Sequence, residues 1–445
     1  MYGLAGKVSC SAGVVIGLVL AVYYTNSTLS IGMRALGVTQ ILFKNCQLFD
    51  GVTEHLQPAM QVLIENNRIK AVSAQNIRSR NAQVIDGKGK TLMPGLIDAH
   101  YHALAADLNI RRIDALSPYH VAQYARQFLE NTLRRGFTTV RDAGGADFGL
   151  AQAIAEGLIQ GPRLFYSGKA LSQTGGHGDS RLPHEAHPAL CACGLGSGTL
   201  SQIADGVAEV QRAAREELRK GASQIKIMAS GGVASPSDPV WNLQYSAAEI
   251  RAIVWEAQSW KTYVMAHAYT SESIRRCVEL GVRSIEHGNL IDYETAGFCA
   301  RQDAFVVPTL VAYQALHRDG KALGLPAISL AKLDDVRSAG LQALEHLHRA
   351  GVKIGFGTDL LGGLHQYQCE EFQIRNQVLP AATILRQATS INAELLNRSG
   401  ELGVVAPGAL ADLLLIDGDP LADLAVFTAD GRNIAVLMKD GKLLQ

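Results

Sequence analysis

The sequence predicts an α/β fold of the (β/α)8 or TIM barrel class, joined to an accessory β-sandwich that is built from both chain ends. A length of 445 residues suits a large barrel with a satellite domain. Through the middle of the chain, apolar strand segments alternate with amphipathic helices, which is typical of parallel strands joined by right-handed crossovers. At both ends, short β-type runs alternate with turn residues instead. An open doubly wound sheet is the weaker alternative, because no GxGxxG motif follows the first strand.

Composition and charge are those of a globular protein with a large core. Hydrophobic residues make up 47% of the chain and charged residues 18%, whereas about 25% charged residues are usual. Lysine and arginine together number 41, as do aspartate and glutamate, so the formal net charge is zero. This balance argues against a nucleic-acid-binding protein that relies on a basic patch. The seven cysteines include no CxxC pair and are too sparse for a disulfide scaffold.

Residues 1–36 form a hydrophobic amino-terminal segment that we leave out of the predicted fold. Its apolar run, from Ala12 to Tyr24, is shorter than the ~20 residues of a membrane span and close to the length of a signal-peptide core. Three interpretations remain open: a signal peptide, a membrane anchor, or a start codon placed too early. A start near Met33 predicts a cytoplasmic protein, and the other two predict an exported or membrane-anchored one.

The β-sandwich is expected from residues 37–93 together with residues 400–445. Neither end is long enough to close a core alone, so we expect the two ends to share one domain. Turn signals separate the β-type runs at Asn66-Asn67, Asp86-Gly87 and Asp440-Gly441.

Residues 94–399 are predicted to form the catalytic barrel. Its eight strand segments are LIDAHYHA, TTVRDAG, RLFYSG, IKIMASG, YVMAHAY, SIEHGN, FVVPTLV and KIGFGTD. Helices are expected at Ser201–Lys220, Ala247–Trp260, Ser271–Leu280 and Leu330–Ala350. Glycine, which readily adopts the left-handed conformation at a helix C-terminus, marks four helix-to-strand junctions, namely Gly136, Gly221, Gly281 and Gly351.

Polar side chains occur where several of the apolar strands end. His100 and His102 are two residues apart, so they face the same side of the first strand and can share one metal ion. Lys226 lies in an apolar strand, where a buried lysine is costly unless it is paired or chemically modified. Because a barrel gathers its strand ends at one mouth, the combined set predicts a metal site there. Its members are His100, His102, Lys226, His267, His287 and Asp359.

This pattern is similar to that of the amidohydrolase superfamily, whose members are metal-dependent hydrolases on a (β/α)8 barrel. The phrase TLMPGLIDAHYH carries the resemblance, which covers nearly everything after residue 37. In the subgroup with a lysine at the fourth strand, that side chain, here Lys226, is carboxylated by carbon dioxide and bridges two divalent metal ions together with a hydroxide. By this resemblance one ion is held by His100, His102 and Asp359, and the other by His267 and His287.

The same resemblance implies how the ions and the carboxylate divide the chemistry. Two metal ions lower the pKa of the bridging water and polarise a carbonyl. Asp359 is then the catalytic residue that takes the proton of the attacking hydroxide and passes it to the leaving nitrogen. Zinc suits a mixed set of histidine, carboxylate and carbamate ligands, and manganese or iron could substitute.

Two further segments resemble a branch that cleaves the C-terminal amide of dipeptides and N-acyl amino acids. The branch includes Xaa-Pro and Xaa-Arg dipeptidases and ochratoxin amidohydrolases, and it is related to imidazolonepropionase. The segments are TGGHGD around His177 and SGGVASPSDPVWNLQYS leading to Tyr245. By this resemblance His177 and Tyr245 would contact the scissile carbonyl or the substrate carboxylate. A deaminase of this fold would be expected to carry a glutamate two residues after His267, where this chain has Tyr269.

We therefore expect a binuclear metal-dependent amidohydrolase whose small-molecule substrate carries a free carboxylate next to the scissile amide. Superfamily relatives often assemble, so a homo-oligomer is expected, without a nucleic-acid partner. A cyclic-amide hydrolase of the imidazolonepropionase or hydantoinase type is the alternative, and an inactive structural homologue is the remote one. Arg141 and Asp142, at the end of the second strand, can pair with each other and are expected to have no catalytic role.

Overall fold

A computed structural model describes residues 39–181, 199–235, 238–325 and 327–444, together with the short antiparallel strands β1 (Ala21–Val22) and β2 (Ile31–Gly32). The chain divides into two compact units, residues 1–39 and 40–445. Most of the hydrophobic segment 1–36 lies outside the described residues, and the predicted domain boundaries stay predictions. Within the described ranges, we find no helix long and apolar enough to cross a membrane.

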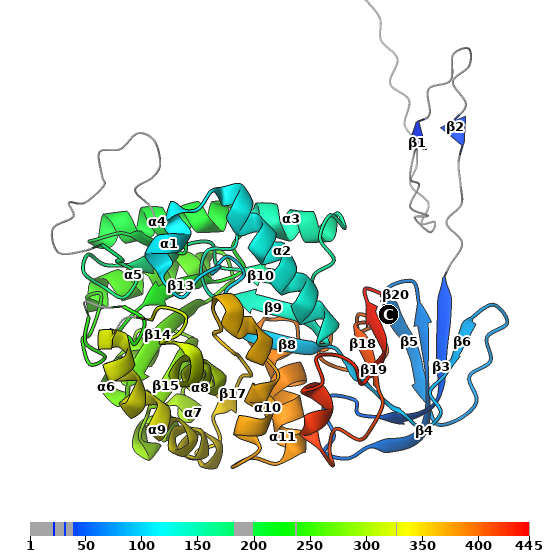
Figure 1. Ribbon diagram of the computed structural model, residues 1–445. Helices are drawn as coiled ribbons and strands as arrows, with labels where there is room; N and C mark the ends of the chain where they lie inside the picture. The colour runs from blue at the N-terminus through cyan, green and yellow to red at the C-terminus, as the bar shows by residue number, and fades with distance from the viewer. Residues whose placement is uncertain are drawn as a thin grey trace, which may run out of the picture. The chain divides into compact units, whose positions relative to one another are not determined.

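Strands from both ends of the second unit pair in one eight-stranded sheet, in the order β20-β19-β18-β7-β3-β4-β5, with β6 paired to β3 (Figure 1). Strand β18 from the C-terminal end pairs antiparallel with β7 from the N-terminal end, so the two ends share this sheet. The strands are β3 (Gln40–Leu48), β4 (Gln57–Glu65), β5 (Arg68–Ser73), β6 (Gln83–Asp86), β7 (Thr91–Pro94), β18 (Leu413–Ile416), β19 (Ile434–Lys439) and β20 (Lys442–Leu443).

Two of the three predicted hairpin turns are present in this sheet. Asn66-Asn67 joins the antiparallel strands β4 and β5, and Asp440-Gly441 joins β19 and β20. The prediction at Asp86-Gly87 is wrong, because the flanking strands β6 and β7 both run parallel to β3. The backbone N–H of Gly87 donates to the carbonyl of Lys44 in β3. In a hairpin, the partner of this N–H would instead lie in the strand that folds back.

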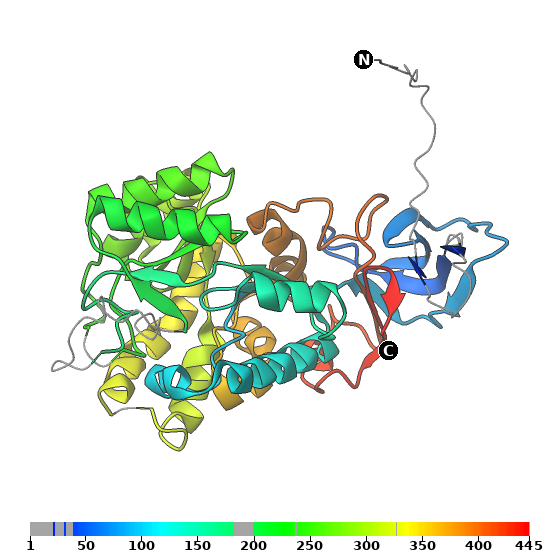
Figure 2. The same ribbon diagram turned by 90° about the horizontal axis from the view of Figure 1, so that it is seen from above.

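The middle of the second unit consists of parallel strands with helices on their outer side (Figures 1 and 2). Backbone hydrogen bonds link Ala99 of the first strand to Phe356, just after the last strand, at 2.8 Å, and link Tyr166 of the third strand to Ser223, just before β13, at 2.8 Å. The strands are β8 (Leu96–Tyr101), β9 (Phe137–Asp142), β10 (Arg163–Tyr166), β11 (Ala170–Ser172), β12 (Ser201–Ile203), β13 (Ile225–Met228), β14 (Val264–Thr270), β15 (Ser284–Leu290), β16 (Phe305–Val307) and β17 (Lys353–Ile354).

Helices follow the strands along the chain, and two predicted boundaries need correction. Ser201–Ile203 is a strand paired with β11 and not the start of a helix, which begins at Val207 after Gly206 turns the chain with a φ of 80°. The predicted strand FVVPTLV stops at Val307, because Pro308 has no N–H for the sheet and a helix starts at Leu310. The helices are α1 (Ile110–Ala115), α2 (Pro118–Arg134), α3 (Phe148–Ala155), α4 (Val207–Arg219), α5 (Ala247–Ser259), α6 (Ser271–Glu279), α7 (Tyr293–Arg301), α8 (Leu310–Asp319), α9 (Ala327–Arg349), α10 (Glu370–Arg375), α11 (Ala381–Arg386) and α12 (Asn392–Leu395).

The four glycine junctions are confirmed as left-handed helix ends. Their φ angles are 92° at Gly136, 89° at Gly221, 93° at Gly281 and 75° at Gly351. Glycine adopts this conformation without the clash that a Cβ would cause. Each junction therefore turns the chain from a helix toward the next strand, which begins within four residues of the glycine.

Candidate active site

A cavity opens where the parallel strands end. Polar and apolar side chains both line it, and the apolar ones include Leu200, Val233 and Leu316. All six predicted metal ligands line this cavity, and so does one of the predicted substrate-contacting residues. They are His100, His102, His177, Lys226, His267, His287 and Asp359.

The alternation of strand β13 explains why a lysine faces this cavity. Ile225 and Ile227 are 1% and 0% exposed and pack in the hydrophobic core. Successive side chains of a strand point to opposite faces, so Lys226 and Met228 point the other way and line the cavity. Burial lowers the pKa of Lys226 to about 8, against the opposing charges of Glu286 and Asp359.

Asp359 lies against three of the histidines. Its Oδ1 is 3.1 Å from Nε2 of His102 and 3.3 Å from Nε2 of His100, and its Oδ2 is 3.8 Å from Nδ1 of His287. Burial opposes ionisation here, yet the charge of His100 and hydrogen bonds from His100 and His102 hold the pKa of Asp359 well below its usual range. One ligand atom each from His100, His102 and Asp359 lies within 4.8 Å of the others, so these three residues can hold a metal ion.

His267 and His287 form a second donor pair beside this group. Their ring centroids are 4.6 Å apart, and burial lowers the pKa of both imidazoles well below its usual range. The neutral imidazole that results is the form that coordinates metals. The backbone of His287 has a φ of 73° and that of Asp359 a φ of 54°. Such left-handed conformations in non-glycine residues are strained and cluster at functional sites.

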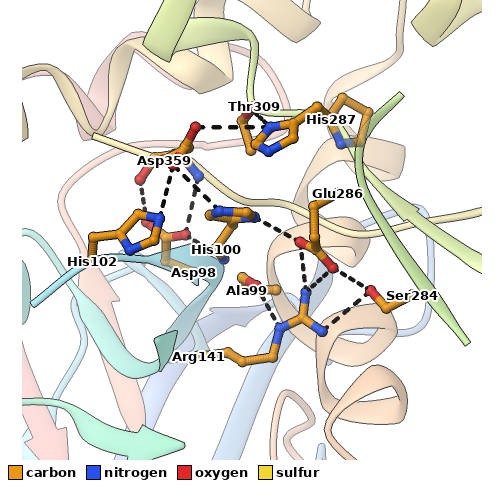
Figure 3. A network of polar contacts seen from close by, with 12 residues as sticks. Asp98, Ala99, His100, His102, Arg141, Ser284, Glu286, His287, Thr309 and Asp359 are labelled. Atoms are coloured by element: carbon orange, nitrogen blue, oxygen red, sulfur yellow. Dashed lines mark hydrogen bonds and ion pairs between the residues drawn. The ribbon is translucent and has the colours of Figure 1, made fainter. Parts of the chain in front are cut away.

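A buried ion pair behind His100 escaped the sequence analysis. Arg141 Nη2 donates to both oxygens of Glu286, at 2.9 and 3.0 Å, and His100 Nδ1 lies 2.7 Å from the same carboxylate (Figure 3). Ser284 Oγ also donates to Glu286, at 2.6 Å. The charge of Arg141 holds the pKa of Glu286 below its usual range despite full burial. Glu286 therefore fixes the orientation of His100, in the way that carboxylates support metal-ligating histidines.

The suggested pairing of Arg141 with Asp142 is wrong. The two residues are consecutive in β9 and point to opposite faces of the strand. The Asp142 carboxylate instead accepts from the backbone N–H groups of Ala103, Gly144 and Ala146. A signal for the true pair was present, since charged residues interrupt both of the predicted strands TTVRDAG and SIEHGN.

His177 reaches the cavity from the loop after β11. Its ring stacks on His267 with centroids 4.3 Å apart, and its Nδ1 lies 3.3 Å from Oδ2 of Asp238. A hydrogen bond from His177 lowers the pKa of the buried Asp238 to about 2. A Cβ on Gly232 would lie 2.3 Å from Cε1 of His177, so the glycine allows the loop after β13 to pack on the imidazole.

Tyr245 does not line the cavity. Its side chain is 3% exposed, and among the described residues its hydroxyl has no hydrogen-bond partner. Two other tyrosines do line the cavity, Tyr269 and Tyr313, with their hydroxyl oxygens 2.9 Å apart. Tyr269 occupies the position where a glutamate would be expected in a deaminase, and burial raises the pKa of its phenol above the usual range. Tyr269 therefore stays protonated.

Parallel strands that end in a cluster of histidines and a carboxylate form a site where His100, His102 and Asp359 can hold a metal ion in an α/β protein. The chain belongs to the amidohydrolase family, whose model matches residues 91–444. Ochratoxinase from Aspergillus niger is 34% identical over 370 residues, which cover 80% of this chain and 75% of that protein.

Two solved structures are similar to this chain at higher sequence identity. A crystal structure of an amidohydrolase is 51% identical, with a TM-score of 0.89, and the match covers 91% of this chain and 99% of that one. A prolidase complexed with N-methylphosphonate-L-proline is 48% identical, with a TM-score of 0.89 and coverage of 92% and 100%. The predicted relation to the dipeptidase and ochratoxinase branch is confirmed. Family and relatives together support hydrolysis of amide bonds.

Proposed function

We propose that the protein is a binuclear metal-dependent amidohydrolase that cleaves the C-terminal amide bond of dipeptides or N-acyl amino acids. The observation that carries this proposal is the metal-competent group His100, His102 and Asp359 in one cavity with His267 and His287. We also take the parallel strands to form a closed (β/α)8 barrel with a β-sandwich beside it. The hydrogen bond from Ala99 N to Phe356 O supports that closure.

The donor set fits two divalent ions, for which zinc is favoured. His100, His102 and Asp359 would hold one, and His267 with His287 the other. Lys226, carboxylated by carbon dioxide, would bridge them, which replaces a buried cation with an anionic oxygen donor. When bound, the ions lower the pKa of a water molecule and polarise the scissile carbonyl.

The side chains of the cavity supply positioning and proton transfer. The Asp359 carboxylate can accept a proton and pass it to the leaving nitrogen. Glu286 binds Nδ1 of His100 and so turns Nε2 of that ring toward the cavity. The His177 imidazole, held by Asp238, faces the cavity as a donor for the substrate carbonyl or carboxylate.

Substrate class is supported by the named relatives. One is an ochratoxinase and another is a prolidase complexed with a derivative of L-proline. A match to an L-hydantoinase spans only 73 residues, or 16% of this chain, and gives the cyclic-amide alternative less weight. The reaction that we propose is therefore hydrolysis of the amide bond next to an amino-acid carboxylate.

A substrate library with metal analysis on the same sample tests this function. We expect two metal ions per chain and hydrolysis of dipeptides and N-acyl amino acids. Matched substrates whose C-terminal carboxylate is converted to an amide serve as the control and should react far more slowly. Turnover of hydantoins or lactams in place of the linear substrates would contradict the proposal, as would a protein that binds no metal.

Tyr245→Phe separates a substrate contact from a packing role. Because the hydroxyl has no partner among the described residues, its removal should leave the thermal unfolding temperature unchanged or slightly higher. If the hydroxyl binds substrate, we expect kcat/KM for carboxylate-bearing substrates to fall about 10-fold or more. Steady-state kinetics and a thermal melt measure the two effects. Unchanged kinetics would contradict the predicted contact between Tyr245 and the substrate.

A further inference from the structure

Lys332 of helix α9 makes three hydrogen bonds to one loop. Its Nζ donates to the backbone carbonyls of Gly232 at 3.1 Å, Ser235 at 2.8 Å and Asp238 at 2.5 Å. An ammonium group has three N–H donors, so this loop occupies all of them. The contacts join positions 94 to 100 residues apart in the sequence.

The loop in question consists of residues 230–235 and 238–245 and follows strand β13. Val233 and Ala234 line the cavity. The Asp238 carboxylate accepts from the backbone N–H of Gly232 at 3.2 Å and from Nε2 of Gln244 at 3.0 Å, and it also holds the His177 ring. Asp238 thus has two roles, because its backbone carbonyl accepts from Lys332 and its side chain orients His177.

These bonds matter because little regular structure holds the loop. Among the described residues it has no helix, and its only sheet-type pairing is the isolated bridge between Ser230 and Leu243. A partly buried carbonyl group that has no hydrogen-bond donor destabilises the folded protein. The single ammonium group of Lys332 satisfies three of them at once and ties them to a helix of 23 residues.

We propose that Lys332 is a positioning residue for the proposed reaction. From helix α9 it fixes the loop so that Asp238 holds His177 on the cavity wall and Gly232 packs on the same imidazole. This inference rests on the proposed function, because His177 matters to catalysis only if the cavity binds the substrate. Lys332 itself lies outside the residues that line the cavity.

The Lys332→Met variant tests the proposal with two readouts. We expect kcat/KM to fall about 10- to 100-fold, mainly through a higher KM, because small misplacements of a substrate-orienting group have effects of this size. Amide hydrogen exchange in residues 230–235 and 238–245 should become faster, while the metal content stays that of the wild type. Lys332→Arg keeps a cationic donor and should restore both readouts in part.

Arg349→Met is the matched control, since it removes one cation from the same helix. The Arg349 guanidinium lies 3.8 Å from Glu345 and over the ring of Tyr293, away from the loop. Amide hydrogen exchange and steady-state kinetics of the Arg349→Met variant should equal those of the wild type.

Three results would overturn or redirect the inference. Wild-type exchange in Lys332→Met would show that Lys332 does not hold the loop. Faster exchange with unchanged KM and kcat would make the contact purely structural and contradict a positioning role. A wild-type protein that hydrolyses no substrate of the library would contradict the proposed function, and the exchange comparison would still decide whether Lys332 fixes the loop.

Discussion

The Lys226→Ala variant is expected to lose bound metal and hydrolytic activity together, with kcat/KM at least about 1000-fold lower than that of the wild type. Lys226 is 1% exposed and faces the same cavity as all the other predicted ligands. Without its amine, the proposed carbamate cannot form and no group replaces the bridging donor that we propose. Metal analysis per chain and steady-state kinetics measure the two losses.

Met228→Ala is the control for this experiment. Met228 lies two residues along the same strand and lines the same cavity, but it is not one of the predicted ligands. The Met228→Ala variant should bind as much metal as the wild type, and only its KM or kcat should change. As an independent readout, wild-type protein equilibrated with ¹³C-labelled carbon dioxide should show a carbamate carbon signal that Lys226→Ala lacks. Two bound ions and full turnover in Lys226→Ala would refute the carbamate.

The Arg141→Leu variant should lower the free energy of unfolding by about 3–5 kcal/mol, because it leaves a buried carboxylate without its partner. Arg141 and Glu286 are both 0% exposed, and the guanidinium also donates to the carbonyl of Ala99 at 2.6 Å. Denaturant unfolding followed by fluorescence measures the loss. A variant as stable as the wild type would show that Glu286 is neutral or otherwise compensated.

A double variant separates stability from function at this pair. Arg141→Leu combined with Glu286→Leu removes both charges, so part of the lost stability should return. Activity should stay low, because His100 no longer has a carboxylate at Nδ1 to set its orientation. Full activity in the double variant would contradict the role that we give to Glu286.

Much of the fold follows from local patterns. The sequence predicts the alternation of strands and helices, because apolar periodicity depends only on neighbouring residues. It also predicts the left-handed glycines at four helix ends, since few other residues tolerate that conformation. Local patterns failed where long-range pairing decided the outcome. Ser201–Ile203 became a strand because β11 lies beside it, and Asp86-Gly87 did not fold back because β3 accepts both flanking strands.

The candidate site likewise has a part that the sequence predicts and a part that it does not. The strand motifs predict His100, His102 and Lys226 on cavity-facing positions, because alternate residues of a strand share a face. The partners of those residues could not be predicted. Glu286 is 145 residues from Arg141 and 186 residues from His100, and no spacing rule connects them. The same applies to Asp238, which lies 61 residues from His177.

By itself, the sequence determined the family of this protein, the alternation of its strands and helices, and the set of residues that we predict as metal ligands. These properties reside in motifs and periodicities that span a few residues each. Only the tertiary structure decided which charge stands beside which ligand, that Tyr245 lies off the cavity wall, and that Lys332 holds the loop beside His177. The physical reason is that such contacts form between strand ends and helices that are distant in the chain, and the packing of the whole domain brings them together.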